Sequence, residues 1–344
     1  MHEFAAGPTR TVERGIMEAF QTPEERSFYR LAIGVLAFNL LIILGGALVR
    51  ATGSGAGCGQ HWPLCNGEVL PGLDDIHRRI EFSHRVLVGL GIIPVILLWW
   101  KARKIYTKSQ LARKAAFWTG IFTFSESAVG ASLVLLKYVG TDASVARSVF
   151  VSAHLLNTLL LIGSLSICVV AAANPGVQTF HFRSLEGRVM AACLIAIAFV
   201  AATGAVTALG DTLYPAKNVS EIAQSVPASA EILKKLRIIH PFMAMASGGL
   251  CVLASVITYA STGKDRVQNL AYVVGGLVAA QIMLGFANLF MLAPIALQLA
   301  HLLVADALWI ALVFLTVAVT GVVVKTASDA TSTPAMSGLA GGAL

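Results

Sequence analysis

The chain has 344 residues, of which 56% are hydrophobic and only 12% are charged, and its mean hydropathy is +0.76. A soluble domain of this length would need far more charge to cover its surface, so this composition excludes a soluble enzyme. The net charge of +7 does not indicate a nucleic-acid partner, because Lys and Arg report orientation in a membrane protein.

Apolar runs recur along the chain, and most approach or exceed the ~20 residues that cross a bilayer as a helix. There are eight, at about 31–49, 80–100, 115–136, 149–172, 189–209, 238–260, 270–293 and 295–324. The region of Pro294 alone separates the last two, so their boundary is the least defined. The sequence predicts an all-α polytopic membrane protein with eight transmembrane helices and a lipid bilayer around them.

Basic residues gather in two places that lie on the same side of such a protein. They are Arg10, Arg14, Arg26 and Arg30 before the first run, and Lys101, Arg103, Lys104, Lys108, Arg113 and Lys114 after the second. Cytoplasmic loops carry an excess of Lys and Arg. We therefore expect a cell-membrane protein with both termini in the cytoplasm and with the 51–79, 138–147 and 210–237 loops outside.

The two ends of the chain differ from the apolar middle. Residues 1–29 mix Glu and Arg, which is not typical of a cleaved signal peptide. Residues 11–21 fit either an amphipathic surface helix or a solvated lead-in. The tail from Lys325 is rich in Ser, Thr, Gly and Ala, which predicts disorder.

The chain also resembles itself. Residues 46–55 align with 204–213, His84 aligns with His240, and His154 aligns with His301, at offsets of 158, 156 and 147 residues. Conserved order with drifting spacing indicates an internal repeat. We expect two tandem four-helix bundles related by a pseudo-twofold axis, at 31–172 and 189–324, with a cytoplasmic linker at 173–188 and flanking segments at 1–30 and 325–344.

Four of the eight histidines fall on the predicted helices that run inward: His84, His154, His240 and His301. Each lies within about seven residues of the outer end, so at ~1.5 Å per residue the four share one depth. A single membrane histidine is commonly satisfied by a neighbouring helix, but four at one depth indicate sites. Paired imidazoles from a four-helix bundle typically hold haem iron, so we expect one haem site in each half.

The halves differ one helical turn before the first histidine. Glu81 lies three residues before His84, whereas Arg237 lies three residues before His240. A carboxylate beside a porphyrin can act as a base or stabilise positive charge; the alternative is an interfacial acid paired with Arg85 or Arg50. Basic side chains near the outer ends suit haem propionates or ordinary anchoring at the interface; they are Arg50, Arg85, Arg147 and Arg237.

The first outer loop holds Cys58 and Cys65 in the stretch GCGQHWPLCNG. Because the outside is oxidising, a disulfide is expected; metal binding by these thiols with His61 is the weaker alternative. A short helix on the membrane surface is expected at about 229–237.

These residues resemble the haem A synthase family. The match is GALVRATGSGAGCGQHWPLCNG, the Glu-x-x-His of EFSH, and the surroundings of His154, His240 and His301. The resemblance implies oxidation of the C8 methyl group of haem O to a formyl group, giving haem A for cytochrome c oxidase. It also implies that His84 and His154 flank the substrate haem, that His240 and His301 ligate a haem b cofactor, and that Glu81 is the catalytic carboxylate.

The resemblance implies haem O synthase, a protohaem farnesyltransferase, as a partner, with an electron partner that the sequence does not identify and a homo-oligomer left open. A second cysteine pair found in some relatives is absent from the later outer loop.

Two other classes of membrane protein would also need four histidines. One is a quinol-linked haem b electron carrier, which would not need Glu81 in one half only. The other is a haem transporter or chaperone, which would bind porphyrin without changing it.

Overall fold

The computed structural model describes residues 22–72, 74–174, 176–222, 225–227 and 230–323. The surface helix considered for 11–21 and the disordered tail expected from Lys325 lie outside these residues.

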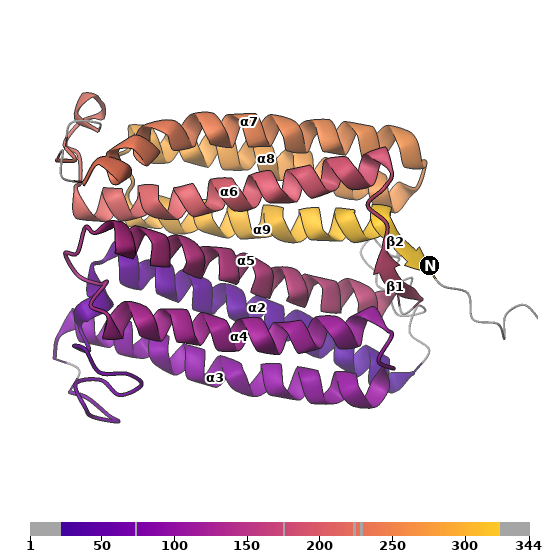
Figure 1. Ribbon diagram of the computed structural model, residues 1–344, viewed down its shortest axis with the longest axis horizontal. Helices are drawn as coiled ribbons and strands as arrows, with labels where there is room; N and C mark the ends of the chain where they lie inside the picture. The colour runs from indigo at the N-terminus through magenta and orange to yellow at the C-terminus, as the bar shows by residue number, and fades with distance from the viewer. Residues whose placement is uncertain (1–21, 73, 175, 223–224, 228–229, 324–344) are drawn as a thin grey trace, which may run out of the picture.

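Long α-helices make up most of the described chain (Figure 1). They are α2 (Pro23–Ala51), α3 (Ile76–Ile105), α4 (Leu111–Leu135), α5 (Val145–Ala173), α6 (Leu185–Leu213), α7 (Glu231–Thr262), α8 (Asp265–Phe290) and α9 (Ile295–Thr320). All are helices where the sequence predicts apolar runs, and seven of them are long and apolar enough to cross a membrane. The chain is therefore an all-α, multi-pass membrane protein. The remaining helix, α4, includes Glu126 and several Ser and Thr side chains, which lower its hydropathy.

Short polar residues set the start of several helices by accepting hydrogen bonds from the first backbone N–H groups. Thr22 and Glu25 form a reciprocal capping box at α2, and Asp75 caps α3 through His77 N–H. Pro294 is the N-cap of α9, where its missing N–H costs nothing. The predicted break between the last two apolar runs is confirmed there.

The surface helix expected at about 229–237 does not exist as a separate element. From Glu231 onward these residues are the first turns of α7, which continues without a break through Pro241 to Thr262. The apolar window locates the part of a helix that suits lipid, whereas polar residues such as Lys234 and Lys235 extend the same helix beyond it. The apolar run at 238–260 therefore marks the start of this helix several residues later than Glu231, where the helix begins.

The helices pack in chain order, so that each contacts the next (Figure 1). In that view α2 to α5 lie in the lower part and α6 to α9 in the upper part. The two groups meet along α2 and α5 on one side and α6 and α9 on the other. At this seam the indole N–H of Trp309 donates to the carbonyl of Leu159 at 2.8 Å. A Cβ on Gly163 would lie 3.2 Å from Trp309 Nε1, so this glycine lets α5 and α9 approach closely.

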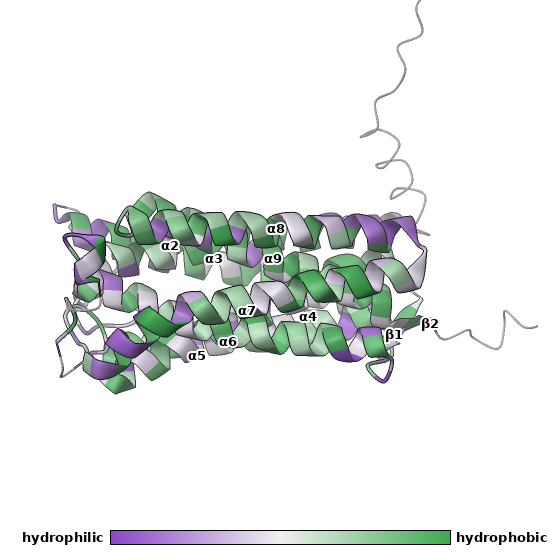
Figure 2. Ribbon diagram, turned by 90° about the horizontal axis from the view of Figure 1, so that it is seen from above, coloured by the Kyte–Doolittle hydropathy of each residue, from purple (hydrophilic) through white to green (hydrophobic). Residues whose placement is uncertain are grey.

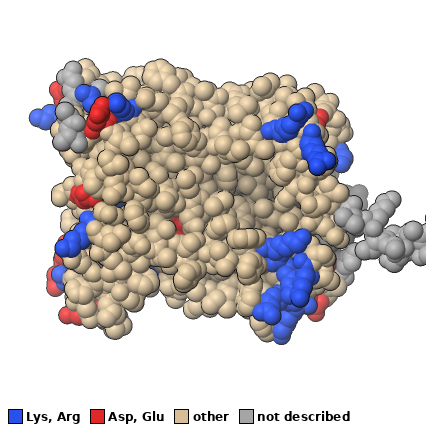
Figure 3. Space-filling view, in the orientation of Figure 1, with Lys and Arg blue, Asp and Glu red and all other residues tan. Residues whose placement is uncertain are grey.

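The ends of the helices are polar and their middles are apolar (Figure 2). The face in Figure 3 shows the same division, with charged side chains gathered at both ends and a band between them that is uncharged except for one acidic spot. We call the end with the 52–75, 136–144, 214–230 and 291–294 connections the loop end. The opposite end, which includes Lys101, Arg103, Lys104 and Lys108, is the basic end.

At the basic end, β1 (Val177–Phe180) and β2 (Gly321–Val323) form a short antiparallel pair (Figure 1). Phe180 pairs with Gly321, so the connection between the two helix groups is tied to the end of α9. The sequence predicted only a linker here, because strand pairing between residues 140 positions apart leaves no local pattern.

Candidate functional site

The four helical histidines lie in one layer near the loop end. His84 is on α3, His154 on α5, His240 on α7 and His301 on α9, and each follows the first residue of its helix by six to nine positions. All four helices begin at the loop end (Figure 1). At ~1.5 Å per residue the histidines lie about 9–14 Å along their helices, which agrees with the shared depth predicted from the sequence.

Each histidine faces a glycine on a neighbouring helix. A Cβ built on Gly46 of α2 would lie 3.2 Å from His84 Nε2, and one on Gly204 of α6 would lie 2.9 Å from His240 Cε1. A Cβ on Gly130 of α4 would lie 3.7 Å from His154 Cε1. A Cβ on Gly285 of α8 would lie 3.5 Å from His301 Cε1. Side chains at the tightest of these positions would push the imidazoles aside, so the glycines leave space for the rings.

The histidines fall into two pairs by helix group, His84 with His154 and His240 with His301. One pair belongs to α2–α5 and the other to α6–α9. Among the described residues, no three His, Cys, Asp or Glu are grouped to hold a bare metal ion. Two imidazoles from two helices of one four-helix bundle are instead the ligand set that haem iron takes.

The ring nitrogens are suited to an added group. Nδ1 of His84 and Nδ1 of His301 are buried without a hydrogen-bond partner among the described residues. Buried polar atoms in native proteins nearly always have a partner, so these rings fit a site that a bound group completes. With the glycines opposite them, the residues present fit haem.

Three polar side chains that the sequence reasoning missed lie against the histidines. Thr203 Oγ1 is 3.1 Å from His240 Nδ1, and Gln281 Nε2 is 3.1 Å from His301 Nε2. Glu126 Oε1 is 3.2 Å from His154 Nδ1, at an angle that does not qualify as a hydrogen bond. The internal repeat could have identified two of them, because Glu126 and Gln281 each lie four residues before a facing glycine at the same offset of 155.

Glu81 is 3% exposed and both of its carboxylate oxygens have partners. Oε2 accepts the backbone N–H of Cys58 at 2.8 Å, and Oε1 accepts from Arg85 at 2.6 Å. Arg85 also donates to the carbonyls of His61 and Leu64, each at 2.7 Å. The turn that precedes His84 therefore holds the first loop onto the bundle.

The disulfide predicted between Cys58 and Cys65 is present in the structure, and it closes this same loop. A Cβ on Gly57 would lie 2.6 Å from the backbone of His77, so the loop can pass this close to α3 only because Gly57 has no side chain. The backbone N–H of Cys58 connects the disulfide loop directly to Glu81.

The remaining candidate arginines also hold loops or neighbouring helices. Arg147 donates to the carbonyls of Gly140 and Asp142. Arg237 pairs with Asp211 at 2.6 Å and donates to loop atoms that include the carbonyls of Tyr214 and Ile222. Their binding to haem propionates stays a prediction.

Arg50 joins the two helix groups. Its guanidinium donates to the carbonyl of Ala208 at 2.7 Å, to Thr212 Oγ1 at 2.9 Å and to Gln298 Oε1 at 3.0 Å. Thus α2 of the first group is tied to α6 and α9 of the second on the loop-end side of the histidine layer. A propionate contact for Arg50 likewise stays a prediction.

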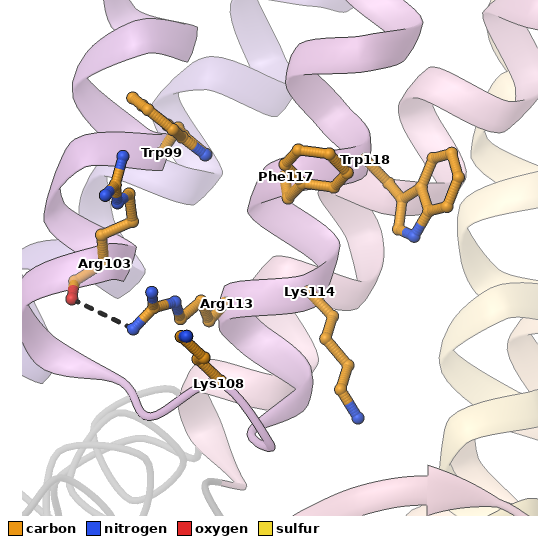
Figure 4. A pocket seen from close by; sticks show the side chains of 7 residues that line it. All are labelled: Trp99, Arg103, Lys108, Arg113, Lys114, Phe117 and Trp118. Carbon is orange, nitrogen blue, oxygen red and sulfur yellow. Dashed lines mark hydrogen bonds between the residues drawn. The ribbon is translucent and has the colours of Figure 1, made fainter.

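A surface pocket of about 310 Å³ lies far from this layer (Figure 4). Arg103, Lys108, Arg113 and Lys114 line it together with Trp99, Phe117 and Trp118. Arg113 donates to the carbonyl of Arg103 (Figure 4). Trp99 is 15 residues beyond His84 on α3, roughly 22 Å along the helix axis. Cations and tryptophans are what a membrane interface favours, so this pocket is not the candidate site.

Comparison with known proteins assigns the chain to a family. The sequence pattern of the family described as "Cytochrome oxidase assembly protein" (COX15-CtaA) matches residues 29–313. The chain belongs to this family. The matched range contains all four helical histidines, Glu81 and the disulfide loop.

Individual relatives carry two different names. A protein named "Protoheme IX farnesyltransferase" from Thermus thermophilus is 37% identical over 296 residues, which are 86% of this chain and 49% of that protein. A protein named "Heme A synthase" from Bacillus mycoides is 27% identical over 281 residues, 80% of this chain and 88% of that protein. The chain thus spans about half the length of the Thermus relative and nearly all of the Bacillus one.

Proposed function

We propose that the chain oxidises the C8 methyl group of haem O to a formyl group and so makes haem A for cytochrome c oxidase. The observation that supports this function best is the pair of matching histidine sites, one in each helix group, with Glu81 beside only the first. Family membership and the similarity to a protein named "Heme A synthase" support the same function. The reaction class is that of an oxidoreductase acting on a CH group.

In this proposal the two sites differ in role. His84 and His154 would hold the substrate haem, and His240 and His301 would hold a haem b cofactor. Bound haem b would supply one-electron chemistry. The glycines opposite the histidines would leave room for the imidazole rings, and the helices around them would exclude water.

Glu81 would be the catalytic carboxylate. It lies one helical turn from His84, so the two side chains share one face of α3. The N–H of Cys58 and the guanidinium of Arg85 hold its oxygens in place, which would fix the carboxylate relative to the substrate methyl group. A preorganised charge of this kind stabilises positive charge that develops during oxidation or accepts the proton that is released.

The membrane arrangement in the proposal includes α4 as an eighth span, because its ends lie level with those of α3 and α5 (Figure 1). The two groups of four helices would be bundles related by a pseudo-twofold axis along the membrane normal. The basic end would face the cytoplasm of a bacterial-type cell membrane. The histidine layer and the disulfide loop would then face the oxidising side.

The partner that the proposal requires is the enzyme that makes haem O. A relative named "Protoheme IX farnesyltransferase" matches this chain over only half of its own length. This supports the view that a farnesyltransferase acts next to a unit of this kind. An electron partner is also required, because oxidation of a methyl group to a formyl group releases electrons.

Pigment extraction distinguishes this function from its rivals. The chain would be expressed in a host that makes haem O and lacks its own haem A synthase, and the haems would be extracted and separated. The proposal predicts haem A or its hydroxylated precursor. A quinol-linked electron carrier or a haem chaperone would yield only unmodified haem, and a farnesyltransferase would convert haem B to haem O in a host without that enzyme.

A further inference from the structure

The contact between Glu126 and His154 is the one acidic contact to a helical histidine in the described chain. Glu126 Oε1 lies 3.2 Å from His154 Nδ1, and the side chains of His154 and Glu126 are 32% and 22% exposed. The two residues come from neighbouring helices, α4 and α5. Partial exposure next to buried packing indicates that space remains beside this ring.

Neighbouring donors fix the orientation of this carboxylate. Asn157 donates its amide N–H to Glu126 Oε2, and the Thr158 hydroxyl donates to Oε1. Asn157 is itself oriented by Ser125, whose hydroxyl donates to its Oδ1. Glu126 therefore accepts both of these hydrogen bonds, and among the residues that the structure describes the imidazole of His154 is the other polar group against it.

The other helix group has an amide in the equivalent place. Gln281 aligns with Glu126 in the internal repeat, and its Nε2 lies 3.1 Å from Nε2 of His301, the ring nitrogen opposite to the one that Glu126 approaches in His154. The amide and the carboxylate have nearly the same shape, but only the carboxylate carries negative charge. The two histidine pairs thus differ in the charge beside one ring, in addition to the difference between Glu81 and Arg237.

We propose that Glu126 is a positioning residue that accepts the Nδ1–H of His154, fixes its tautomer and increases its donor strength toward iron. This inference deepens the proposed function and rests on it. A histidine ligand usually gives its second N–H to a carboxylate or carbonyl, and this partner makes the ligand more basic. Hydrogen bonds at functional sites are often long or poorly aligned until the complex forms.

A more basic axial ligand stabilises ferric over ferrous iron. The haem of the first helix group would therefore have a lower midpoint potential than it would with a glutamine in this place. Glu126 would bias this haem toward the oxidised state, as suits a haem that is the substrate of an oxidation. Gln281 leaves the second haem without this bias, as suits an electron carrier.

The test is an exchange of the two side chains in the intact protein loaded with haem. Glu126→Gln should raise the midpoint potential of the first haem, by about 59 mV if the preference for ferric iron falls tenfold. It should also weaken haem binding there by about 10–100-fold and shift the low-spin ferric EPR signal. Glu126→Asp, which keeps the charge but withdraws it by one methylene, should give a smaller shift. Gln281→Glu is the control, because it changes the charge beside the second histidine pair and should leave the potential of the first haem unchanged.

The outcomes separate this inference from the proposed function. If Glu126→Gln and Glu126→Asp both leave the potential and EPR signal of the first haem unchanged, the inference is wrong. His154→Ala measures the site itself: if that variant still holds two low-spin haems, the proposed function fails instead. A Glu126→Gln protein that retains its second haem is folded, so its first-site readouts are interpretable.

Discussion

His240 is the residue whose replacement tests the cofactor site most simply. His240→Ala should remove the tightly held haem b and, with it, all haem A formation, because the single remaining imidazole of His301 leaves iron with one protein ligand. The measurement is the low-spin haem spectrum of the purified protein. His181→Ala is a suitable control, since His181 lies in the connection before α6, outside the histidine layer. A full haem b spectrum in His240→Ala would remove this residue from the site.

Glu81 is the residue whose chemical role and structural role must be separated. Glu81→Gln keeps the size of the side chain but removes its charge and basicity. We expect both haems to bind while haem O or a hydroxylated intermediate accumulates, with a rate loss of ~10²–10⁴. Extracted pigments give the readout.

The Cys58→Ser/Cys65→Ser protein is the matched control for Glu81→Gln, because it loosens the same loop and keeps the carboxylate. If Glu81→Gln forms nearly normal amounts of haem A, Glu81 only anchors the loop. The same conclusion follows if haem A formation falls equally in Glu81→Gln and in the double cysteine variant.

At the scale of the helices, the glycines on α2, α4, α6 and α8 can be tested one at a time. Gly204→Ala would place a Cβ 2.9 Å from His240 Cε1, so the imidazole must move and the second haem should be lost or become high-spin. Gly275→Ala is the matched control, because a Cβ there has no atom within 4 Å and alanine favours a helix by up to about 1 kcal/mol. Equal haem content in the two variants would show that the close approach is unimportant.

The disulfide loop is the second element that makes a direct prediction. Removing both Cys58 and Cys65 should destabilise the loop by roughly 2–3 kcal/mol at most, as expected from chain entropy for so short a loop. Yield and haem A formation should fall while both haems still bind, since Glu81 and Arg85 continue to hold the loop. Haem content and thermal unfolding of the double variant check this. If the double variant lost all of its haem, the disulfide rather than the helix packing would form the first haem site.

The sequence predicted the helices and the histidine layer because both depend on local patterns. The length of each apolar run predicts a membrane span, and the position of a residue along its span predicts its depth in the membrane, as for His84 or His240. The start of α7 was predicted wrongly because polar residues continue the helix outside the apolar window. The contacts of Arg50 with Ala208 and Gln298 join residues about 160 to 250 positions apart, and no pattern within one helix predicts them. Glu126 was overlooked because the repeat was aligned through its histidines and through residues 46–55, and not through the helix that carries Glu126.

At the scale of the whole molecule, the two similar helix groups would have different roles. They meet along α2, α5, α6 and α9, where Arg50 and Trp309 cross the seam. The same fold places two imidazoles in each group. The acidic residues Glu81 and Glu126 are in the first group, and Arg237 and Gln281 hold the equivalent positions in the second. This asymmetry is why the first group would oxidise a bound haem and the second would pass electrons.

The most direct measurement of this division is the pigment composition of His154→Ala beside that of the parent protein, both purified from a host that makes haem O. The account predicts that the parent yields haem b together with haem O, its hydroxylated form or haem A. His154→Ala should yield haem b alone, because its farnesylated haem has lost one ligand while His240 and His301 remain intact. Farnesylated haem retained in full by His154→Ala, or haem b lost from it, would contradict the assignment of substrate to the first group and cofactor to the second.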